Sequence, residues 1–226
     1  MAHIDMRTGN GWQRLNSNNV RMWNGSSWQR PKARIWNGHD WIECLEERHV
    51  DTVDAIQTEG FWSDWHNNIV KTHYTPMWDW NHLVAGSYNP YHDRWDGGNE
   101  GGMAFWDLGY IQGLLRGARI EKVELFLYAD HFGYYSGGEA VVGVHNARGW
   151  QEYFSETTHG VARARYYGRN TSQWIQLPNW VGDGFRDNWI AGITTKADSP
   201  NLWQYGVFAG TNEGWKKPKL RFTYWK

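Results

Sequence analysis

The stretch that decides the fold is ARIEKVELFLYA, residues 118–129. Its apolar side chains at Val123, Leu125 and Leu127 follow one another at a period of two residues. Successive side chains of a β-strand point to opposite faces of the sheet, so this period is typical of a strand with one face on a core. Charged residues, among them Glu121 and Glu124, lie between the apolar positions. The stretch therefore gives the strongest strand prediction in the chain.

Strand-like segments continue along the rest of the chain. They occupy residues 139–145, 160–167, 172–177, 189–194, 203–209 and 219–224. Turn-forming clusters separate them at residues 136–138, 168–170, 178–179 and 197–200. Many short strands at regular spacing predict an all-β fold, here a jelly-roll β-sandwich. For helix we expect at most one short turn, near residues 111–117.

A tryptophan-rich repeat precedes these strands. Residues 20–30, VRMWNGSSWQR, recur as residues 33–43, ARIWNGHDWIE, and a degenerate copy, MRTGNGWQR, stands at 6–14. Each copy contains Asn-Gly, which accepts positive φ angles and nucleates tight hairpin turns. The second and third copies place a tryptophan on each side of the turn, where cross-strand aromatic pairs stabilise a hairpin. We therefore expect three small hairpins.

These observations divide the chain into hairpin repeats at residues 1–49 and a sandwich domain at residues 50–226. A hairpin of about ten residues is marginally stable alone, so the repeats need something to pack on. The repeats carry five tryptophans: Trp12, Trp23, Trp28, Trp36 and Trp41. We predict that these side chains anchor the hairpins and hold a homo-oligomer together, because so short a segment cannot enclose them.

The composition excludes several classes of partner. The 226 residues carry 23 Lys and Arg against 24 Asp and Glu, a net charge of −1. This balance provides no basic face, so neither nucleic acid nor an anionic membrane is an expected partner. No apolar run approaches the roughly 18 residues of a membrane span, and we expect neither membrane insertion nor a signal peptide. The single cysteine, Cys44, cannot form an internal disulfide, which suits folding in a reducing cytoplasm.

No familiar enzyme motif occurs in the sequence: it lacks a Walker A loop, a Gly-x-Ser-x-Gly elbow, a His-Glu-x-x-His pair and a Cys-x-x-Cys pair. With 24 acidic residues, some carboxylate pair will lie at glycosidase spacing by chance, so such a pair carries little weight. We therefore expect a protein that is not an enzyme, with no catalytic residues, no cofactor and no metal centre.

Two polar patterns are better explained by structure than by a ligand. Residues 93–100, DRWDGGNE, offer oxygen atoms to calcium but lack the order of an EF-hand, and we expect a solvated turn. His131 and His145 flank the turn at residues 136–138, which would place their imidazoles opposite one another on adjacent strands. Two histidines are too few to hold a metal, so we expect them to be hydrogen-bonded structural side chains.

Aromatic residues in loops are the remaining binding candidates. Sugar rings stack on Trp and Tyr, while Asp, Asn and His bind the hydroxyl groups. The segments around residues 78–82 and 88–95 hold both residue types in expected loops. The glycan-binding candidates are Trp78, Trp80, Tyr91, His92, Asp93 and Trp95. The alternative for each aromatic ring is a place in the core or in a protein interface.

Five segments, in order, resemble a known family. They are residues 102–108 (GMAFWDL), 115–128 (LRGARIEKVELFLY), 131–146 (HFGYYSGGEAVVGVHN), 189–193 (WIAGI) and 218–224 (PKLRFTY). Residues 85–226 are in these respects similar to the C-terminal β-sandwich of minor tail proteins from phages of actinobacteria. The Trp-Asn-Gly-x-x-Trp repeats are also similar to repeats at the ends of phage tail proteins.

The resemblance implies a bacteriophage virion structural protein, a tail appendage or receptor-binding module that contacts host cell-surface glycan. It implies other virion proteins as partners, a location on the tail or particle surface after synthesis in the host cytoplasm, and, by analogy with phage fibres, a trimer. The chain is short for a tail protein and its region 61–100 is rich in tryptophan, so a capsid-surface decoration or adapter role without a receptor stays open. A glycan-degrading tail enzyme is a further alternative. The family supplies no catalytic residues.

Overall fold

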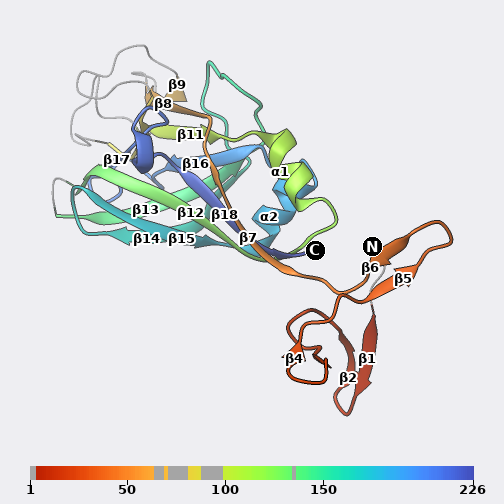
Figure 1. Ribbon diagram of the computed structural model, residues 1–226. Helices are drawn as coiled ribbons and strands as arrows, with labels where there is room; N and C mark the ends of the chain where they lie inside the picture. Colours follow the sequence, from red (N-terminus) through yellow and green to blue (C-terminus); the bar gives the residue numbers. More distant parts are fainter. Residues whose placement is uncertain (1–3, 64–68, 71–80, 88–98, 134–135) are drawn as a thin grey trace.

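The fold is all-β, as the sequence predicts. The structure is a computed structural model, and it describes residues 4–63, 69–70, 81–87, 99–133 and 136–226. Two antiparallel sheets pack against one another, and three separate hairpins precede them in the chain (Figure 1). The architecture is therefore sandwich-like, while the jelly-roll connectivity stays a prediction.

The first sheet is built around one long strand, β12 (Arg119–Phe132). One edge of β12 pairs with β15 (Thr171–Leu177), and the other edge pairs with β18 (Lys219–Trp225) and with β17 (Gly206–Phe208). Two more strands extend the sheet, β7 (Arg48–Asp54) beside β18 and β10 (Leu83–Ala85) beside β17. β18 thus lies between β12 and β7, as an inner strand of the sheet.

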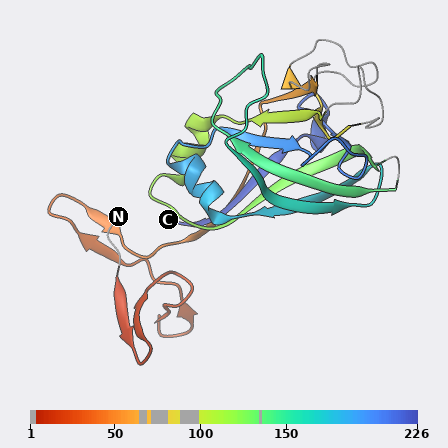
Figure 2. The same ribbon diagram turned by 180° about the vertical axis from the view of Figure 1, so that it is seen from behind.

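The second sheet has six strands. Their order is β14 (Thr158–Tyr166), β13 (Gly138–His145), β16 (Gly192–Lys196), β11 (Gly101–Phe105), β8 (Gln57–Ser63) and β9 (Ile69–Val70). Two short helices, α1 (Leu108–Leu115) and α2 (Asn179–Arg186), lie together at one end of the sandwich (Figures 1 and 2). No helix in the described ranges is long and apolar enough to cross a membrane.

The predicted alternation of β12 forms the centre of the core. Val123, Leu125 and Leu127 are completely buried. Register shifts between Ile120 and Lys122, and between Ala129 and His131, interrupt the regular pairing at the two ends. Each shift has the geometry of a β-bulge, which turns the strand and changes the face that the following side chains occupy.

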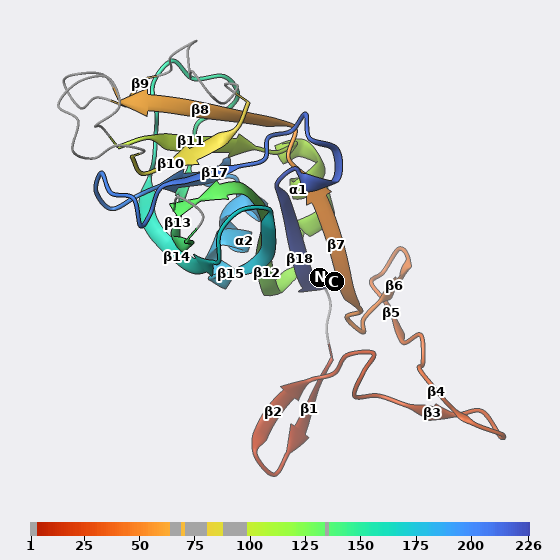
Figure 3. The same cartoon turned by 90° about the vertical axis from the view of Figure 1, so that its left-hand side faces the viewer.

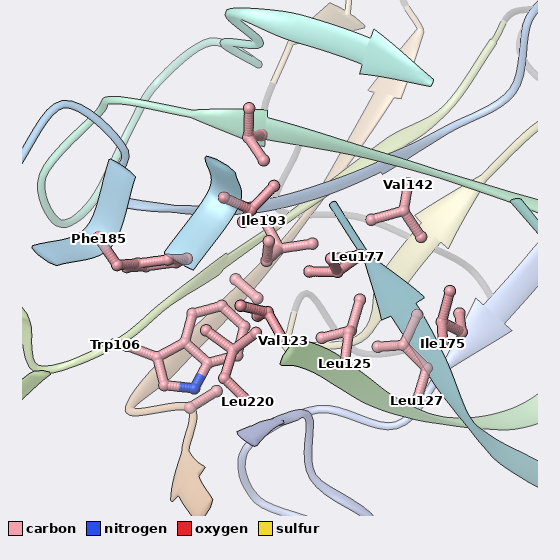
Figure 4. Close-up of a cluster of buried hydrophobic side chains, with 14 of the residues drawn as sticks. Trp106, Val123, Leu125, Leu127, Val142, Ile175, Leu177, Phe185, Ile193 and Leu220 are labelled. Atoms are coloured by element: carbon pink, nitrogen blue, oxygen red, sulfur yellow. The ribbon is translucent and has the colours of Figure 1, made fainter. Parts of the chain in front are cut away.

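Both sheets contribute to this core, as Figure 4 shows. Leu125 and Leu220 come from the first sheet, whereas Val142 and Ile193 come from the second. Trp106 closes one end of the core, and its indole N–H donates a hydrogen bond to the carbonyl oxygen of Val53 at 3.0 Å. A buried indole needs such a partner, because an unsatisfied donor inside the protein would cost stability.

The three predicted hairpins are present. They pair β1 (Asp5–Thr8) with β2 (Gly11–Arg14), β3 (Met22–Trp23) with β4 (Trp28–Gln29), and β5 (Arg34–Trp36) with β6 (Trp41–Glu43). Cross-strand rings meet in the last two hairpins, with ring centroids 5.7 Å apart for Trp23 and Trp28 and 5.8 Å apart for Trp36 and Trp41. Figures 1 and 2 show the hairpins standing clear of the sandwich.

The Asn-Gly turns form through the asparagine side chain. Asn24 Oδ1 accepts hydrogen bonds from the backbone amides of Ser26 and Ser27, at 2.9 and 2.8 Å. Asn37 Oδ1 accepts the equivalent pair from His39 and Asp40 in the next hairpin. Gly25 and Gly38 have φ angles of 100° and 102°, in the region that favours glycine. The repeated sequence therefore gives the same turn twice.

Several details differ from the sequence predictions. The expectation of at most one short helical turn, near residues 111–117, is wrong, because α1 (108–115) and α2 (179–186) are both helices of eight residues. Helix α2 extends beyond the turn expected at 178–179, because the buried side chains of Val181 and Phe185 pack on the core. The strand expected at 189–194 begins only at Gly192, since the amides of Trp189 and Ile190 donate to the carbonyl of Gly184 in α2. The strand expected at 203–209 is limited to β17, residues 206–208.

Candidate functional site

All six predicted glycan contacts lie outside the described residues: Trp78, Trp80, Tyr91, His92, Asp93 and Trp95. So does most of the possible calcium segment at residues 93–100. Hydrogen bonds hold the described residues that stand on either side of the segment 88–98. The amide of Ser87 donates to the carbonyl of Asn201 at 3.4 Å, and Asn99 Nδ2 donates to the carbonyl of Ala197 at 2.7 Å. Both sides therefore adjoin the loop at residues 197–205.

This loop lies at the end of the sandwich remote from the two helices, the end that faces the viewer in Figure 3. Internal hydrogen bonds fix its shape. Asn201 Oδ1 accepts from the amide of Gln204 at 2.7 Å, and Gln204 Oε1 accepts from the amide of Asp198 at 2.9 Å. The carbonyl of Trp203 accepts from the amide of Glu139 at the start of β13, at 3.0 Å. Trp203 is thus presented by a rigid loop.

Two exposed aromatic rings flank an arginine at this end. The Arg165 guanidinium carbon lies 4.0 Å from the ring centroid of Trp203 and 5.6 Å from that of Tyr167. Trp203 is 50% exposed and Tyr167 is 78% exposed. Among the described residues, the Arg165 guanidinium makes these ring contacts but no hydrogen bond, so its N–H groups can donate to a ligand. We refer to Arg165, Tyr167 and Trp203 as the distal cluster.

A charged network adjoins the distal cluster on the outer face of β14. Arg163 binds both oxygens of Asp198 at 2.8 Å and Glu139 Oε2 at 2.9 Å. Gln204 Nε2 donates to Asp198 Oδ2 at 2.8 Å, and His159 Nε2 lies 3.0 Å from Asp198 Oδ1. The hydrogen bond from Arg163 is the largest cause that holds the pKa of Asp198 well below its usual range. The network therefore stays charged and rigid at neutral pH, and it positions the loop that carries Trp203.

The exposed rings and the guanidinium of the distal cluster can both contact a sugar. An exposed indole or phenol ring presents an apolar face on which a sugar ring can stack, and a guanidinium donates to hydroxyl or carboxylate oxygens. Arg163 and Gln204 donate to the carboxylate oxygens of Asp198, and His159 Nε2 lies 3.0 Å from Oδ1, so this carboxylate is held within the charged network. The distal cluster is therefore a candidate binding surface.

A second aromatic surface covers the outer side of the first sheet. Because Leu125 and Leu127 face the core, Phe126 and Tyr128 face outward. Trp174 packs on Phe126 with ring centroids 5.3 Å apart, and Trp215 meets Tyr128 edge-on at 5.3 Å. Trp215 is 65% exposed, so this face too presents an accessible ring.

Three side chains with metal-binding atoms converge near Trp215. His82 Nε2 lies 2.7 Å from Glu213 Oε1 and 3.8 Å from Asp130 Oδ2, and all three side chains are largely buried. Sequence analysis missed this group because its members come from three distant segments. The only signal was the charge of Asp130 within an otherwise apolar strand end. We refer to His82, Asp130 and Glu213 as the histidine–carboxylate triad.

The expected pairing of His131 with His145 is wrong. β12 and β13 belong to different sheets, so the two strands do not pair with one another as the arms of a hairpin. His145 Nε2 lies 3.1 Å from the carbonyl oxygen of Ala104, a partner on the second sheet. Its burial lowers its pKa to about 4, so it is neutral at physiological pH. His131 instead packs edge-on against Tyr205, with ring centroids 5.4 Å apart.

The five hairpin tryptophans remain accessible to solvent. Their exposed fractions are at least one half in every case: Trp12, Trp23, Trp28, Trp36 and Trp41. Within each of the last two hairpins, the paired rings cover one another only in part. Each hairpin therefore exposes tryptophan rings to solvent, and exposed aromatic side chains are candidates for contact with another protein.

Comparison with known proteins does not assign the chain to a family. No protein-family profile matches it, and no curated protein sequence is significantly similar to it. The resemblance to phage minor tail proteins therefore stays a prediction.

Proposed function

We propose that this protein is a bacteriophage virion structural protein, a tail appendage or receptor-binding module that binds a host cell-surface glycan without cleaving it. The observation that carries the proposal is the distal cluster, in which Trp203 on a hydrogen-bonded loop and Tyr167 at the end of β14 present exposed rings on either side of Arg165. Such a preformed aromatic surface loses little conformational entropy when a sugar stacks on it. The resemblance to minor tail proteins supports the placement on a virion.

The hairpins at the opposite end supply the anchor in this proposal. Their five exposed tryptophans pack on other virion proteins or on the hairpins of symmetry copies, most simply in a trimer. The glycan-binding end then points away from the particle, because the distal cluster lies at the end of the sandwich remote from the helices (Figures 1 and 3).

The test is binding of the purified full chain to isolated actinobacterial cell-wall polysaccharide. We expect binding, and no release of reducing sugar over time. Trp203→Ala should weaken binding by about 1–3 kcal/mol, roughly 5- to 150-fold, as expected for an aromatic anchor. The matched control is Trp215→Ala, which removes an equally accessible ring from the outer face of the first sheet and should leave the affinity unchanged.

The outcomes separate the alternatives. Loss of binding in the control but not in Trp203→Ala would move the site to the outer face of the first sheet. Release of reducing sugar would indicate a glycan-degrading tail enzyme. Absence of binding would contradict the receptor function and favour a capsid-surface decoration or adapter protein, for which the exposed hairpin tryptophans alone would suffice. Antibody labelling of virions would then show whether the protein lies on the head or the tail.

A further inference from the structure

The histidine–carboxylate triad has the composition of a metal site. Its ligand atoms, one nitrogen and two oxygens, all lie within 4.8 Å of one another. Asp130 Oδ2 and Glu213 Oε1 are buried, and apart from their ion-pair contacts with His82 Nε2, at 3.8 and 2.7 Å, they accept no hydrogen bond from any described residue. Buried carboxylate oxygens are normally satisfied, because removing them from water without a partner costs stability. Both oxygens lie on the side of their carboxylates that faces His82 Nε2.

Lys216 holds the other oxygen of each carboxylate. Its ammonium group donates to Asp130 Oδ1 at 2.8 Å and to Glu213 Oε2 at 3.3 Å. The ammonium therefore orients the two carboxylates and leaves Oδ2 and Oε1 directed toward the imidazole. Polar groups that bind the non-ligating atoms are the usual way in which proteins orient metal ligands.

The backbone around the triad is held in place on each segment. Asp130 stands at the register shift between Ala129 and His131, and a bulge of this kind redirects a side chain. Glu213 precedes the 3₁₀ turn η2 (Gly214–Lys216), which brings Lys216 back over the carboxylates. The segments before His82 and Glu213 are tied together, because Asn81 Nδ2 donates to Thr211 Oγ1 at 3.2 Å.

Thr58 on β8 completes this support. Its hydroxyl donates to the carbonyl oxygen of Asn81 and accepts from the amide of Thr211 at 2.9 Å. The second sheet therefore fixes the distance between the chain segments that carry His82 and Glu213. A preformed site needs little rearrangement on binding, which favours affinity.

We propose that His82 Nε2, Asp130 Oδ2 and Glu213 Oε1 bind a zinc ion. An imidazole nitrogen with two carboxylate oxygens suits zinc, whereas calcium takes six to eight oxygen ligands. Ligands at about 2.0–2.2 Å from a tetrahedral zinc ion lie roughly 3.3 Å from one another. The separations of 2.7 and 3.8 Å from His82 Nε2 to the two carboxylate oxygens lie on either side of this value, so small side-chain movements would bring the three atoms to it. The ion ties β10, β12 and the segment before η2 together, and this stabilises the outer face of the first sheet. The assignment does not depend on glycan binding.

The test uses the full chain after removal of metal with a chelator and dialysis. Zinc bound per chain is measured by equilibrium dialysis and mass spectrometry, and the melting temperature is measured with and without zinc. We expect the native chain to bind one more zinc ion than His82→Ala, Asp130→Asn or Glu213→Gln. Zinc should raise the melting temperature of the native chain alone, because a ligand that binds only the folded state stabilises it.

His159→Ala is the matched control. His159 also contacts two carboxylates, but Glu156 lies at its Nδ1 and Asp198 at its Nε2, so the two cannot share a metal with one ring nitrogen. This variant should bind as much zinc as the native chain. Asp130→Asn preserves the size of the side chain, and near-ultraviolet circular dichroism shows whether it is folded. Equal zinc binding by the native chain and a folded Asp130→Asn would overturn the proposal, and so would a larger rise in melting temperature with calcium than with zinc.

Discussion

Glu47 and Lys226 exchange two backbone hydrogen bonds: the amide of each donates to the carbonyl oxygen of the other, at 2.8 and 3.0 Å. The neighbouring Glu46 binds Arg14 of the first hairpin at 3.1 Å and Arg119 of β12 at 3.0 Å. The amide of Ser17 also donates to the carbonyl of Glu46 at 3.0 Å. This short segment therefore joins the hairpins to the sandwich through both backbone and side-chain contacts.

Glu46→Gln should loosen the first hairpin without unfolding the sandwich. The change removes two partly exposed ion pairs, each with a typical contribution of about 0.2–1 kcal/mol. We expect the amide of Ser17 to exchange its hydrogen roughly two- to thirtyfold faster, while amides of β12 and β18 exchange at native rates. Glu43→Gln is the control, since Glu43 pairs only with Arg34 of its own hairpin among the described residues. Equal effects of the two substitutions would contradict this role of Glu46.

Replacing exposed hairpin tryptophans with serine should weaken self-association. Trp12, Trp28 and Trp41 are the most exposed of the five, and burying a large apolar side chain contributes roughly 1.5–3 kcal/mol. We expect the triple variant Trp12→Ser, Trp28→Ser, Trp41→Ser to shift the full chain toward monomer in light scattering at matched concentration. The control is Trp150→Ser, at a similarly exposed position in the sandwich, which should associate normally. A native chain that is already a monomer would show that the hairpins bind a different protein.

Leu125→Ala should be strongly destabilising. Leu125 is fully buried between the two sheets, and deleting a buried leucine side chain costs about 2–5 kcal/mol because it leaves a cavity. The measurement is the midpoint of urea unfolding. Leu114→Ala in α1 serves for comparison, because Leu114 is only partly buried beside the same core. Its loss of stability should be clearly smaller, and equal losses would argue against β12 as the centre of the core.

His145 should make the free energy of unfolding depend on pH between about 4 and 6.5. Burial lowers its pKa from 6.5 to about 4 in the folded state. Between these values the unfolded chain binds the extra proton, so the free energy of unfolding falls as the pH falls from 6.5 to 4 and then levels off. The slope from this group is at most about 1.4 kcal/mol per pH unit, or about 3 kcal/mol in total. His145→Gln should remove this component of a pH series of urea unfolding curves, and an unchanged series would contradict the assignment.

The strands were predictable where burial alternates along the chain. Val123, Leu125 and Leu127 follow that pattern, and the Asn-Gly repeats specify their turns through local hydrogen bonds. Helix α2 was missed because its sequence, NWVGDGFR, has two glycines and weak intrinsic helix propensity. Packing selects the helix there: a Cβ on Gly182 would lie 2.6 Å from Val123 Cγ2, so only glycine permits the close approach to β12.

The sequence pattern did not predict which sheet each strand joins, nor the residues that form the two candidate sites. β12 and β13 follow one another in the chain, yet the local sequence pattern does not show that they belong to different sheets. Only glycine fits directly before β13, since the φ angle of Gly137 is 78° and a Cβ there would lie 2.1 Å from the carbonyl oxygen of Tyr166. The distal cluster and the histidine–carboxylate triad each combine distant segments, and such proximity is set by the tertiary fold alone.

The position of β18 between β12 and β7 affects how the protein folds during synthesis. Tyr224 of β18 pairs with Ile120 on one side and with His49 on the other. A ribosome releases β7 and β12 long before β18, so the first sheet lacks the strand that joins β12 to β7 until Trp225 has left the exit tunnel. Such distant pairings fold slowly, whereas the hairpins need only local contacts. A nascent chain would therefore display its paired tryptophans beside unpaired strand edges, a state in which aggregation competes with folding.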